Sequence, residues 1–167
     1  MRTRRLGFAV ALLVFALDQL VKWIVTGPLH VGSIGDQLYV TSFFNFTFTK
    51  NEGISLGLLN ATNPVGRWML VGLTSAIAIG VAVWIGRERN RIDQVALGMV
   101  LGGALGNICD RVRFGYVVDF ADLHFGEWRP FLIFNVGDAA ISIAVVILLL
   151  RAFLTRKEES KETIEHA

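Results

Sequence analysis

Polar side chains interrupt stretches of this sequence that are otherwise apolar. Ionisable groups inside a membrane segment are costly, so each one is a candidate for a functional role. Seven such residues lie within apolar stretches and an eighth, Asp119, lies just beyond one; the seven are Asp18, Lys22, Asn107, Asp110, Arg111, Asn135 and Asp138. Their spacing suggests which of them act together.

Two pairs have the spacing of neighbours on one helix face. Asn135 and Asp138 are three residues apart, so both side chains can contact one ligand. Asp18 and Lys22 are four residues apart with the acid first, which favours an ion pair within the helix. Alternatively, Lys22 extends its ammonium group along the helix to the membrane surface.

Asp110 and Arg111 are adjacent, so their side chains point in different directions and we expect each to bind a different neighbour. A buried arginine is usually bound by carboxylates or carbonyl oxygens, which favours a structural role for this pair. Asp119 and Asp138 then remain as the acids that have no nearby cation in the sequence.

Two carboxyl groups held together in a cleft of low dielectric constant cannot both be ionised, so they share a proton. One of them then acts as a general base on a water molecule, while the protonated one polarises a scissile carbonyl. Asp119 and Asp138 therefore have the residue types of an aspartic protease. Acidic pairs also serve in proton relays, and position alone leaves both functions open.

Four apolar stretches approach or reach the roughly 20 residues that a helix needs to cross a bilayer. They are residues 6–25, 68–85, 94–111 and 131–150. Hydrophobic residues make up 53% of the 167-residue chain, more than the roughly 45–50% of soluble domains. We therefore expect an all-α membrane protein, a bundle of four transmembrane helices that forms a single integral membrane domain over residues 1–167.

The first and third stretches each leave a question open. The first follows Arg2, Arg4 and Arg5 as in a cleaved signal peptide, but charged residues interrupt it and no small-residue cleavage site follows, which favours a retained helix. The third is rich in glycine: Gly98, Gly102 and Gly106 recur every four residues, which predicts close helix packing.

The polar residues of three helices fall at one depth. At about 1.5 Å per residue, Asp18 lies roughly 18 Å and Asp110 roughly 24 Å from the inner ends of their helices. Asp138 lies roughly 10 Å below the outer end of the fourth helix by the same rise. All three levels are in the outer half of a hydrocarbon core about 30 Å thick. Agreement between three helices favours a common site.

Basic clusters predict the orientation. They precede the first helix, join the second to the third and follow the fourth: Arg2, Arg4, Arg5; Arg87, Arg89, Arg91; Arg156, Lys157, Lys161. By the positive-inside rule these three segments, and hence both termini, are cytoplasmic. The charged tail 156–167 is expected to be a frayed, solvated end.

The connection between the first and second helices carries a strand signal. From Phe44 to Thr49, aromatic residues alternate with Asn and Thr, which is typical of a half-buried strand. We expect a small extracytoplasmic β-structure at about 36–60, with its phenylalanines facing lipid or the helices, and an external loop at 112–130. A plain interfacial loop remains the alternative for the first region.

The sequence resembles the lipoprotein signal peptidases, or signal peptidase II family, over nearly its whole length. Five ordered blocks carry the resemblance: DQLVK at 18–22, NEG at 51–53, GNICDR at 106–111, VVDF at 117–120 and FNVGD at 134–138. The chain departs from the family at Gly137, where alanine is usual, and at Ile54-Ser55-Leu56, where the family tends to have Ala-Ala-Phe.

The resemblance implies that Asp119 and Asp138 are the catalytic dyad. The residues that would orient the dyad, support the site or hold the substrate backbone are Asn51, Gly53, Asn107, Arg111, Asn135 and Asp18, with Lys22 and Asp110 as structural polar groups. The family cleaves bacterial prolipoproteins before a diacylglyceryl-modified cysteine, at the outer leaflet of the cytoplasmic (inner) membrane. The resemblance also implies a monomer in contact with membrane lipid. It implies no metal, no cofactor and no nucleic acid.

Other functions fit the sequence less well. Residues 53–57 match the G-x-S-x-G pattern of serine hydrolases, but no strand–turn–helix setting or triad histidine accompanies them. The histidines are dispersed and form no H-E-x-x-H, which disfavours a metalloprotease. A proton-coupled transporter would use the acids as a relay, yet they cluster at one depth and no inverted repeat is visible. A non-catalytic scaffold leaves the converging acids unexplained.

Overall fold

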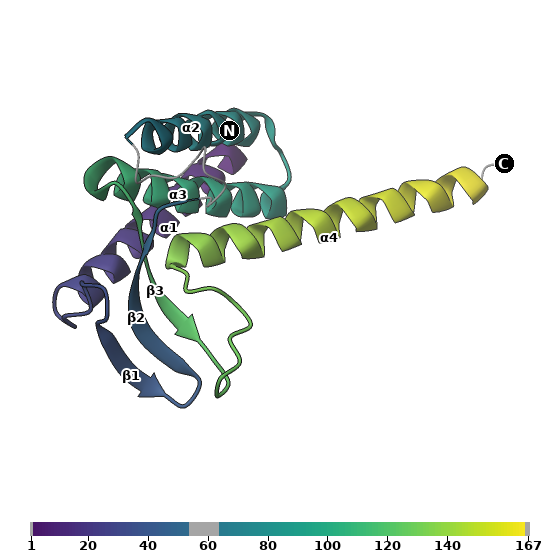
Figure 1. Ribbon diagram of the computed structural model, residues 1–167. Helices are drawn as coiled ribbons and strands as arrows, with labels where there is room; N and C mark the ends of the chain where they lie inside the picture. Colours follow the sequence, from purple (N-terminus) through teal and green to yellow (C-terminus); the bar gives the residue numbers. More distant parts are fainter. Residues whose placement is uncertain (1, 54–63, 166–167) are drawn as a thin grey trace.

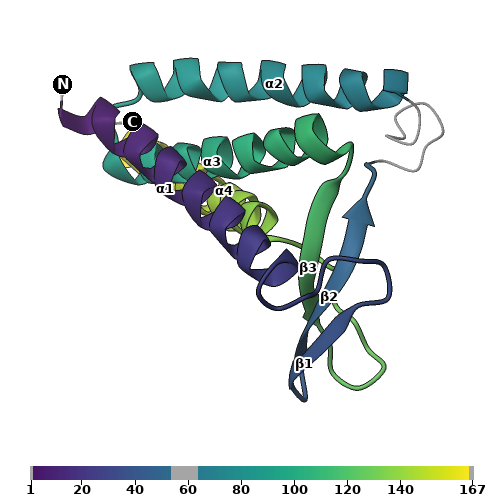
Figure 2. The same ribbon diagram turned by 90° about the vertical axis from the view of Figure 1, so that its left-hand side faces the viewer.

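The computed structural model describes residues 2–53 and 64–165. Its elements, in chain order, are α1 (Arg2–Thr26), β1 (Gln37–Thr41), β2 (Phe44–Asn51), α2 (Pro64–Arg87), α3 (Arg91–Phe114), β3 (Val117–Leu123) and α4 (Val136–Glu165). The helices lie side by side, and the strands form a sheet that extends from one end of them (Figures 1 and 2).

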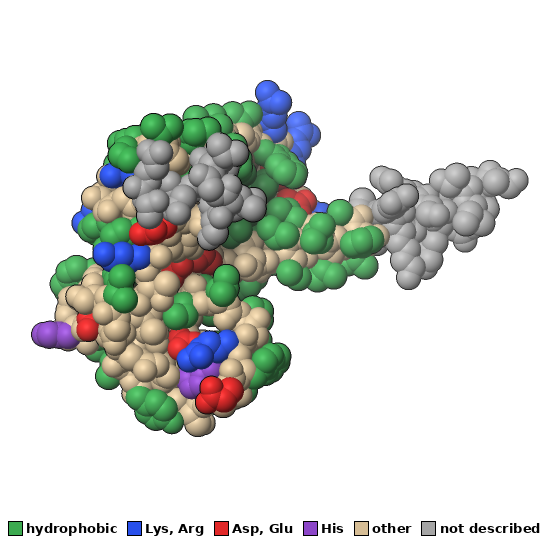
Figure 3. Space-filling model, in the orientation of Figure 1, with side chains coloured by type: hydrophobic (Ala, Val, Ile, Leu, Met, Phe, Trp, Pro, Cys, Tyr) green, Lys and Arg blue, Asp and Glu red, His purple; other side chains and the backbone are tan. Residues whose placement is uncertain are grey.

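All four expected helices are present, and each is long and apolar enough to cross a membrane. Large hydrophobic side chains are exposed along them, as lipid-facing surfaces require (Figure 3). The fourth helix differs from its prediction at both ends. It begins at Val136 instead of residue 131, because Phe134 pairs with Ala121 of β3. Its backbone stays helical to Glu165, where a frayed end was expected, and α4 projects beyond the other helices (Figure 1).

The strands form one antiparallel sheet in the order β1-β2-β3. The alternating segment at Phe44 is β2, as predicted, and its register opposes Thr49 to Asp119 of β3. The prediction of an external loop at 112–130 was wrong in two places. Helix α3 continues to Phe114 and ends on Gly115, whose φ of 91° is left-handed, and β3 occupies 117–123.

Two apolar clusters hold these elements together. One joins the helices through Ala11, Ala78, Ile85, Leu97 and Leu101. The other seals the sheet against the end of α1 through Val25, Val31, Phe48, Val118, Phe120 and Ala121. The β2 phenylalanines were expected to face lipid or the helices; Phe48 is buried in the second cluster near the end of α1, and Phe44 and Phe46 pack against that cluster while partly buried.

The glycines of α3 lie where neighbouring helices approach most closely, as their spacing predicted. A Cβ atom at Gly98 would collide with the carbonyl oxygen of Gly7, and one at Gly102 would lie 2.5 Å from that of Ala11. On another face of α3, a Cβ at Gly103 would collide with the carbonyl oxygen of Gly137. Small residues thus bring α1 and α4 against α3 and carry their polar residues into one region.

Candidate active site

The site begins with the first turn of α4. The amide N–H of Asp138 donates to Asn135 Oδ1 at 2.9 Å, and the amide N–H of Asn135 donates to Asp138 Oδ2 at 3.3 Å. Asn135 is therefore the cap of the helix, and Asp138 returns the bond in the manner of a capping box. The three-residue spacing seen in the sequence fixes both side chains at the helix N-terminus.

Two asparagines connect the acids of β3 and α4. Asn135 Nδ2 donates to Asp119 Oδ1 at 2.6 Å and to Asn107 Oδ1 at 3.2 Å. Asn107 Nδ2 in turn donates to Asp138 Oδ1 at 2.8 Å. A continuous hydrogen-bonded path therefore runs from Asp119 through both amides to Asp138. The acids that the sequence left without a cation lie in one polar cluster.

Asp119 is 2% exposed, and its environment opposes ionisation. Burial raises the pKa of Asp119 to about 7, and the charge of Asp138 contributes in the same direction. Hydrogen bonds from Asn51 and Asn135 and the charge of Lys22 offset part of this rise in pKa. The Asp119 carboxyl group is thus poised to hold a proton near neutral pH.

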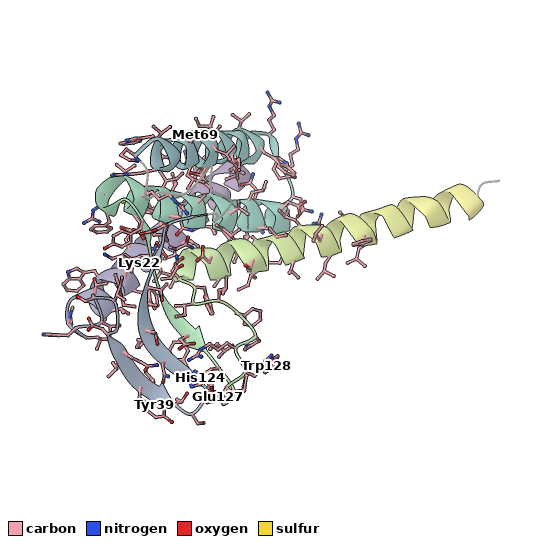
Figure 4. The ribbon with its side chains drawn as sticks, viewed as in Figure 1. Lys22, Tyr39, Met69, His124, Glu127 and Trp128 are labelled. Carbon is pink, nitrogen blue, oxygen red and sulfur yellow. The ribbon has the colours of Figure 1, made fainter. Side chains whose placement is uncertain are left out.

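Behind the two acids, Lys22 is 5% exposed and bound by two carboxylates. Its Nζ lies 2.8 Å from Asp18 Oδ2 and 2.7 Å from Asp110 Oδ2. The predicted ion pair within α1 is confirmed, and the alternative in which Lys22 reaches the membrane surface is wrong. Figure 4 shows Lys22 where the helices meet the sheet.

Both carboxylates that bind Lys22 also hold backbone near the site. Asp18 Oδ1 accepts from the amide N–H of Gly137 at 2.9 Å, so α1 supports the first turn of α4. Asp110 Oδ2 accepts from the amide N–H of Val118 at 3.1 Å, next to Asp119 in the chain. Lys22 therefore connects the carboxylate that supports α4, which carries Asp138, to the carboxylate that supports β3, which carries Asp119.

Arg111 is 9% exposed and lies near Asp119 and Asp138. Its charge interacts with Asp138, Asp119 and Asp110, and its Nε has no hydrogen-bond partner among the described residues. Asp110 binds Lys22 and the amide N–H of Val118, and the expectation that Arg111 binds a different neighbour stays a prediction. Arg111 is a buried cation with an unused donor beside Asp119 and Asp138.

Asn51 ends β2 opposite Val117 of β3 and hydrogen bonds to the Asp119 side chain. Its Oδ1 accepts from the amide N–H of Gly53 at 3.0 Å, and Gly53 has a φ of 95°, which a residue with a Cβ rarely adopts. The turn thus fixes Asn51 beside the site. The departures at Ile54-Ser55-Leu56, and most of the G-x-S-x-G match, lie outside the described residues.

Sequence reasoning missed two polar residues. Gln19 Nε2 donates to Asp110 Oδ1 at 3.0 Å, although only its place within the 18–22 block drew attention to it. Asp122 of β3 is buried and accepts from Thr47 at 3.2 Å and from Arg129 Nε at 3.1 Å, which ties the loop before α4 to the sheet. Asp122 itself lies on the unpredicted strand β3, and Thr47 is 75 residues away in sequence, so no local pattern indicates its buried position.

An apolar cavity of about 250 Å³ opens beside Asp138. The residues that line it come from the first turns of α4 and from the segment before it: Phe131, Leu132, Phe134, Asp138, Ala139, Ser142 and Ile143. Asp138 is its acidic residue, so a hydrophobic ligand in this cavity would lie against one member of the acid pair.

The family model described as signal peptidase (SPase) II matches residues 10–154. The chain belongs to the signal peptidase II family. It is 52% identical, over 92% of its length and 89% of the relative's, to a protein of Rhizorhabdus wittichii named lipoprotein signal peptidase. A protein of the same name from Sphingopyxis alaskensis is 54% identical over 90% of this chain and 86% of its own.

Two solved structures titled as bacterial membrane enzymes have the same fold as this signal peptidase II family member. Both are 30% identical to the chain, with TM-scores of 0.76 and 0.74. The first alignment covers 92% of this chain and 90% of the other, and the second covers 87% and 91%. Sequence and fold therefore agree over the region that holds the acid pair.

Proposed function

We propose that the chain is an aspartic endopeptidase that removes signal peptides from bacterial prolipoproteins, cutting before a diacylglyceryl-modified cysteine with Asp119 and Asp138. Family membership and the names of the relatives support the substrate class. The observation that carries the assignment of the dyad is the hydrogen-bonded path that joins the two acids, with Asp119 poised to hold a proton.

The proposed reaction divides the work between the two carboxyl groups. Both Asp138 oxygens accept from N–H donors, as a carboxylate does, so Asp138 takes a proton from water while the oxygen of that water attacks the scissile carbonyl carbon. Asp119 gives its proton to the carbonyl oxygen. Asp138 then protonates the amide nitrogen and the C–N bond breaks. As the intermediate with two hydroxyl groups collapses, one hydroxyl proton passes to Asp119, which leaves a carboxylic acid and an amine.

Other residues would hold the substrate. A peptide in a membrane keeps its amides bonded within its own helix, so the segment at the cut must unwind before its carbonyl is attacked. The unused Arg111 Nε and the Asn51 amide lie beside Asp119 and would bind the freed backbone groups. The apolar cavity beside Asp138 is lined by the first turns of α4, a helix long and apolar enough to cross a membrane, which suits a lipid-bearing substrate that arrives within the bilayer.

As a member of this family with four membrane-spanning helices, the chain is a multi-pass protein of the bacterial inner membrane. We infer that both termini face the cytoplasm and that the dyad lies towards the outer leaflet, because the basic clusters and the sheet are at opposite ends of the helices. We further infer that it acts as a monomer, since the acids of the proposed dyad come from one chain.

The test is the substitution of each acid in a cleavage assay with a lipidated prolipoprotein. Asp119→Asn and Asp138→Asn should each lower the rate by at least about a hundredfold, since each removes a proton-transfer group. Asp93→Asn is the matched control, because Asp93 pairs with Arg151 at the opposite end of α3. Full cleavage by either site variant would refute the dyad, and proton flux through liposomes of the wild type would support the transporter instead.

A further inference from the structure

A second cavity, of about 300 Å³, lies between the end of α1, the end of α3 and the sheet. Residues that shape it include Gln19, Trp23, Phe48, Arg113, Phe114 and Tyr116. Neither Asp119 nor Asp138 lines it, and it shares no lining residue with the cavity beside Asp138. The proposed reaction assigns this cavity no role.

The charges of this cavity differ between its interior and its rim. Inside, Lys22 and Asp110 bind each other at 2.7 Å, and both are buried. At the rim, Arg113 is exposed and makes one long hydrogen bond, Nη1 to Gln19 Oε1 at 3.4 Å, among the described residues. Lys50 is not a lining residue, but it is exposed and lies over the ring of the lining residue Tyr116, with its Nζ 4.8 Å from the ring centroid. The rim thus presents cations whose charge no described carboxylate balances.

The walls of the cavity carry aromatic side chains at the ends of two apolar helices. Trp23 is 63% exposed near the end of α1, and Tyr116 follows the end of α3. Trp and Tyr at helix ends are typical of the interface between lipid and water. Leu20 of α1 and Val112 of α3, the chain neighbours of the lining residues Gln19 and Arg113, are exposed, so both helices present apolar side chains to lipid at this level.

We propose that this cavity binds the phosphate headgroup of a glycerophospholipid from the leaflet on the sheet side. The guanidinium of Arg113 matches a phosphate diester with two N–H donors, and Lys50 adds a second positive charge. The aromatic walls contact the glycerol region, and the acyl chains lie along α1 and α3. This lipid is distinct from the substrate, because a diacylglyceryl-cysteine carries no phosphate.

The test measures lipid bound to the purified full-length protein by native mass spectrometry. The probes are phosphatidylglycerol, diacylglycerol with the same acyl chains, and inorganic phosphate. The wild type should retain phosphatidylglycerol, and Arg113→Gln should weaken its binding about tenfold, because a hydrogen bond to a charged group is lost. Arg113→Lys keeps the charge and should retain intermediate affinity. Arg89→Gln, which removes an exposed cation from the α2–α3 connection, is the matched control.

Each remaining outcome has one meaning. Equal binding by Arg113→Gln and Arg89→Gln would overturn the site, and equal retention of diacylglycerol would overturn phosphate recognition. Displacement of the lipid by an equal concentration of inorganic phosphate would show that the ligand is the free anion. Cleavage of a lipidated peptide in phospholipid-free detergent should be unchanged in all three variants, which verifies their folding.

Discussion

At the scale of single residues, the raised pKa of Asp119 has a consequence for stability. The carboxyl group titrates near 3.8 in the unfolded chain and near 7 in the folded one, so its contribution to stability is complete below pH 4 and is lost as pH rises through 7. Asp119→Asn cannot ionise and keeps an acceptor for Asn135. This variant should therefore be more stable than the wild type at pH 8, by up to about 4 kcal/mol.

Thermal unfolding in detergent at pH 4 and pH 8 measures this difference. The two proteins should melt together at the lower pH and separate at the higher one. A lower melting temperature of Asp119→Asn at pH 8 would show that burial does not oppose the carboxylate, and would remove the reason for giving the proton to Asp119.

The sequence was most informative where the spacing was local. Asn135 and Asp138 lie one helical turn apart, and so do Asp18 and Lys22, and in both pairs the residues bind each other as predicted. Contacts between distant segments were not accessible by the same reasoning. The bond of Asp110 to Lys22 crosses from α3 to α1, and no periodicity in either helix specifies it.

At the scale of elements, the contact between α3 and α4 at Gly103 positions Asp138. Gly103→Ala would place a methyl group against the backbone of Gly137, which cannot yield as a flexible side chain would. We expect it to destabilise the protein by about 1–3 kcal/mol, as overpacking does, and to reduce cleavage by displacing the first turn of α4.

Gly80→Ala is the control for this prediction, because a Cβ there meets no atom within 4 Å and α2 is helical. It should change stability by no more than about 1 kcal/mol, and towards greater stability, since alanine favours the helix. Denaturation midpoints and cleavage rates of both variants decide the question. If Gly103→Ala and Gly80→Ala have equal stability and equal cleavage rates, the close contact between α3 and α4 does not position Asp138.

Helices were predictable from the sequence because each needs only a long apolar run. The strand β3 was not, because Asp119 and Asp122 interrupt it and all but one of its residues are buried, so the alternation of a half-exposed strand is absent. The start of α4 was placed too early for a related reason. Phe131 to Phe134 are as apolar as the helix, but the pairing of Phe134 with Ala121 keeps the chain extended there.

At the scale of the whole molecule, the orientation in the membrane follows from charge and is open to a labelling test. In a Cys109→Ala background, a single cysteine is placed at Arg89, between α2 and α3, or at Glu127, which lies at the far tip beyond the sheet (Figure 4). Glu127→Cys should react with an impermeant maleimide in intact spheroplasts. Arg89→Cys should react only after permeabilisation, and the reverse pattern would invert the proposed topology.

The helix α2 holds none of the residues assigned to the site, and it runs along the edge of the bundle away from the sheet (Figure 2). Met69, labelled in Figure 4, and Ile79, 65% exposed, lie on its outer surface. A spectroscopic probe attached there would sense the thickness and fluidity of the surrounding bilayer while leaving hydrolysis undisturbed. The enzyme thus offers a built-in position from which turnover can be correlated with the physical state of the membrane.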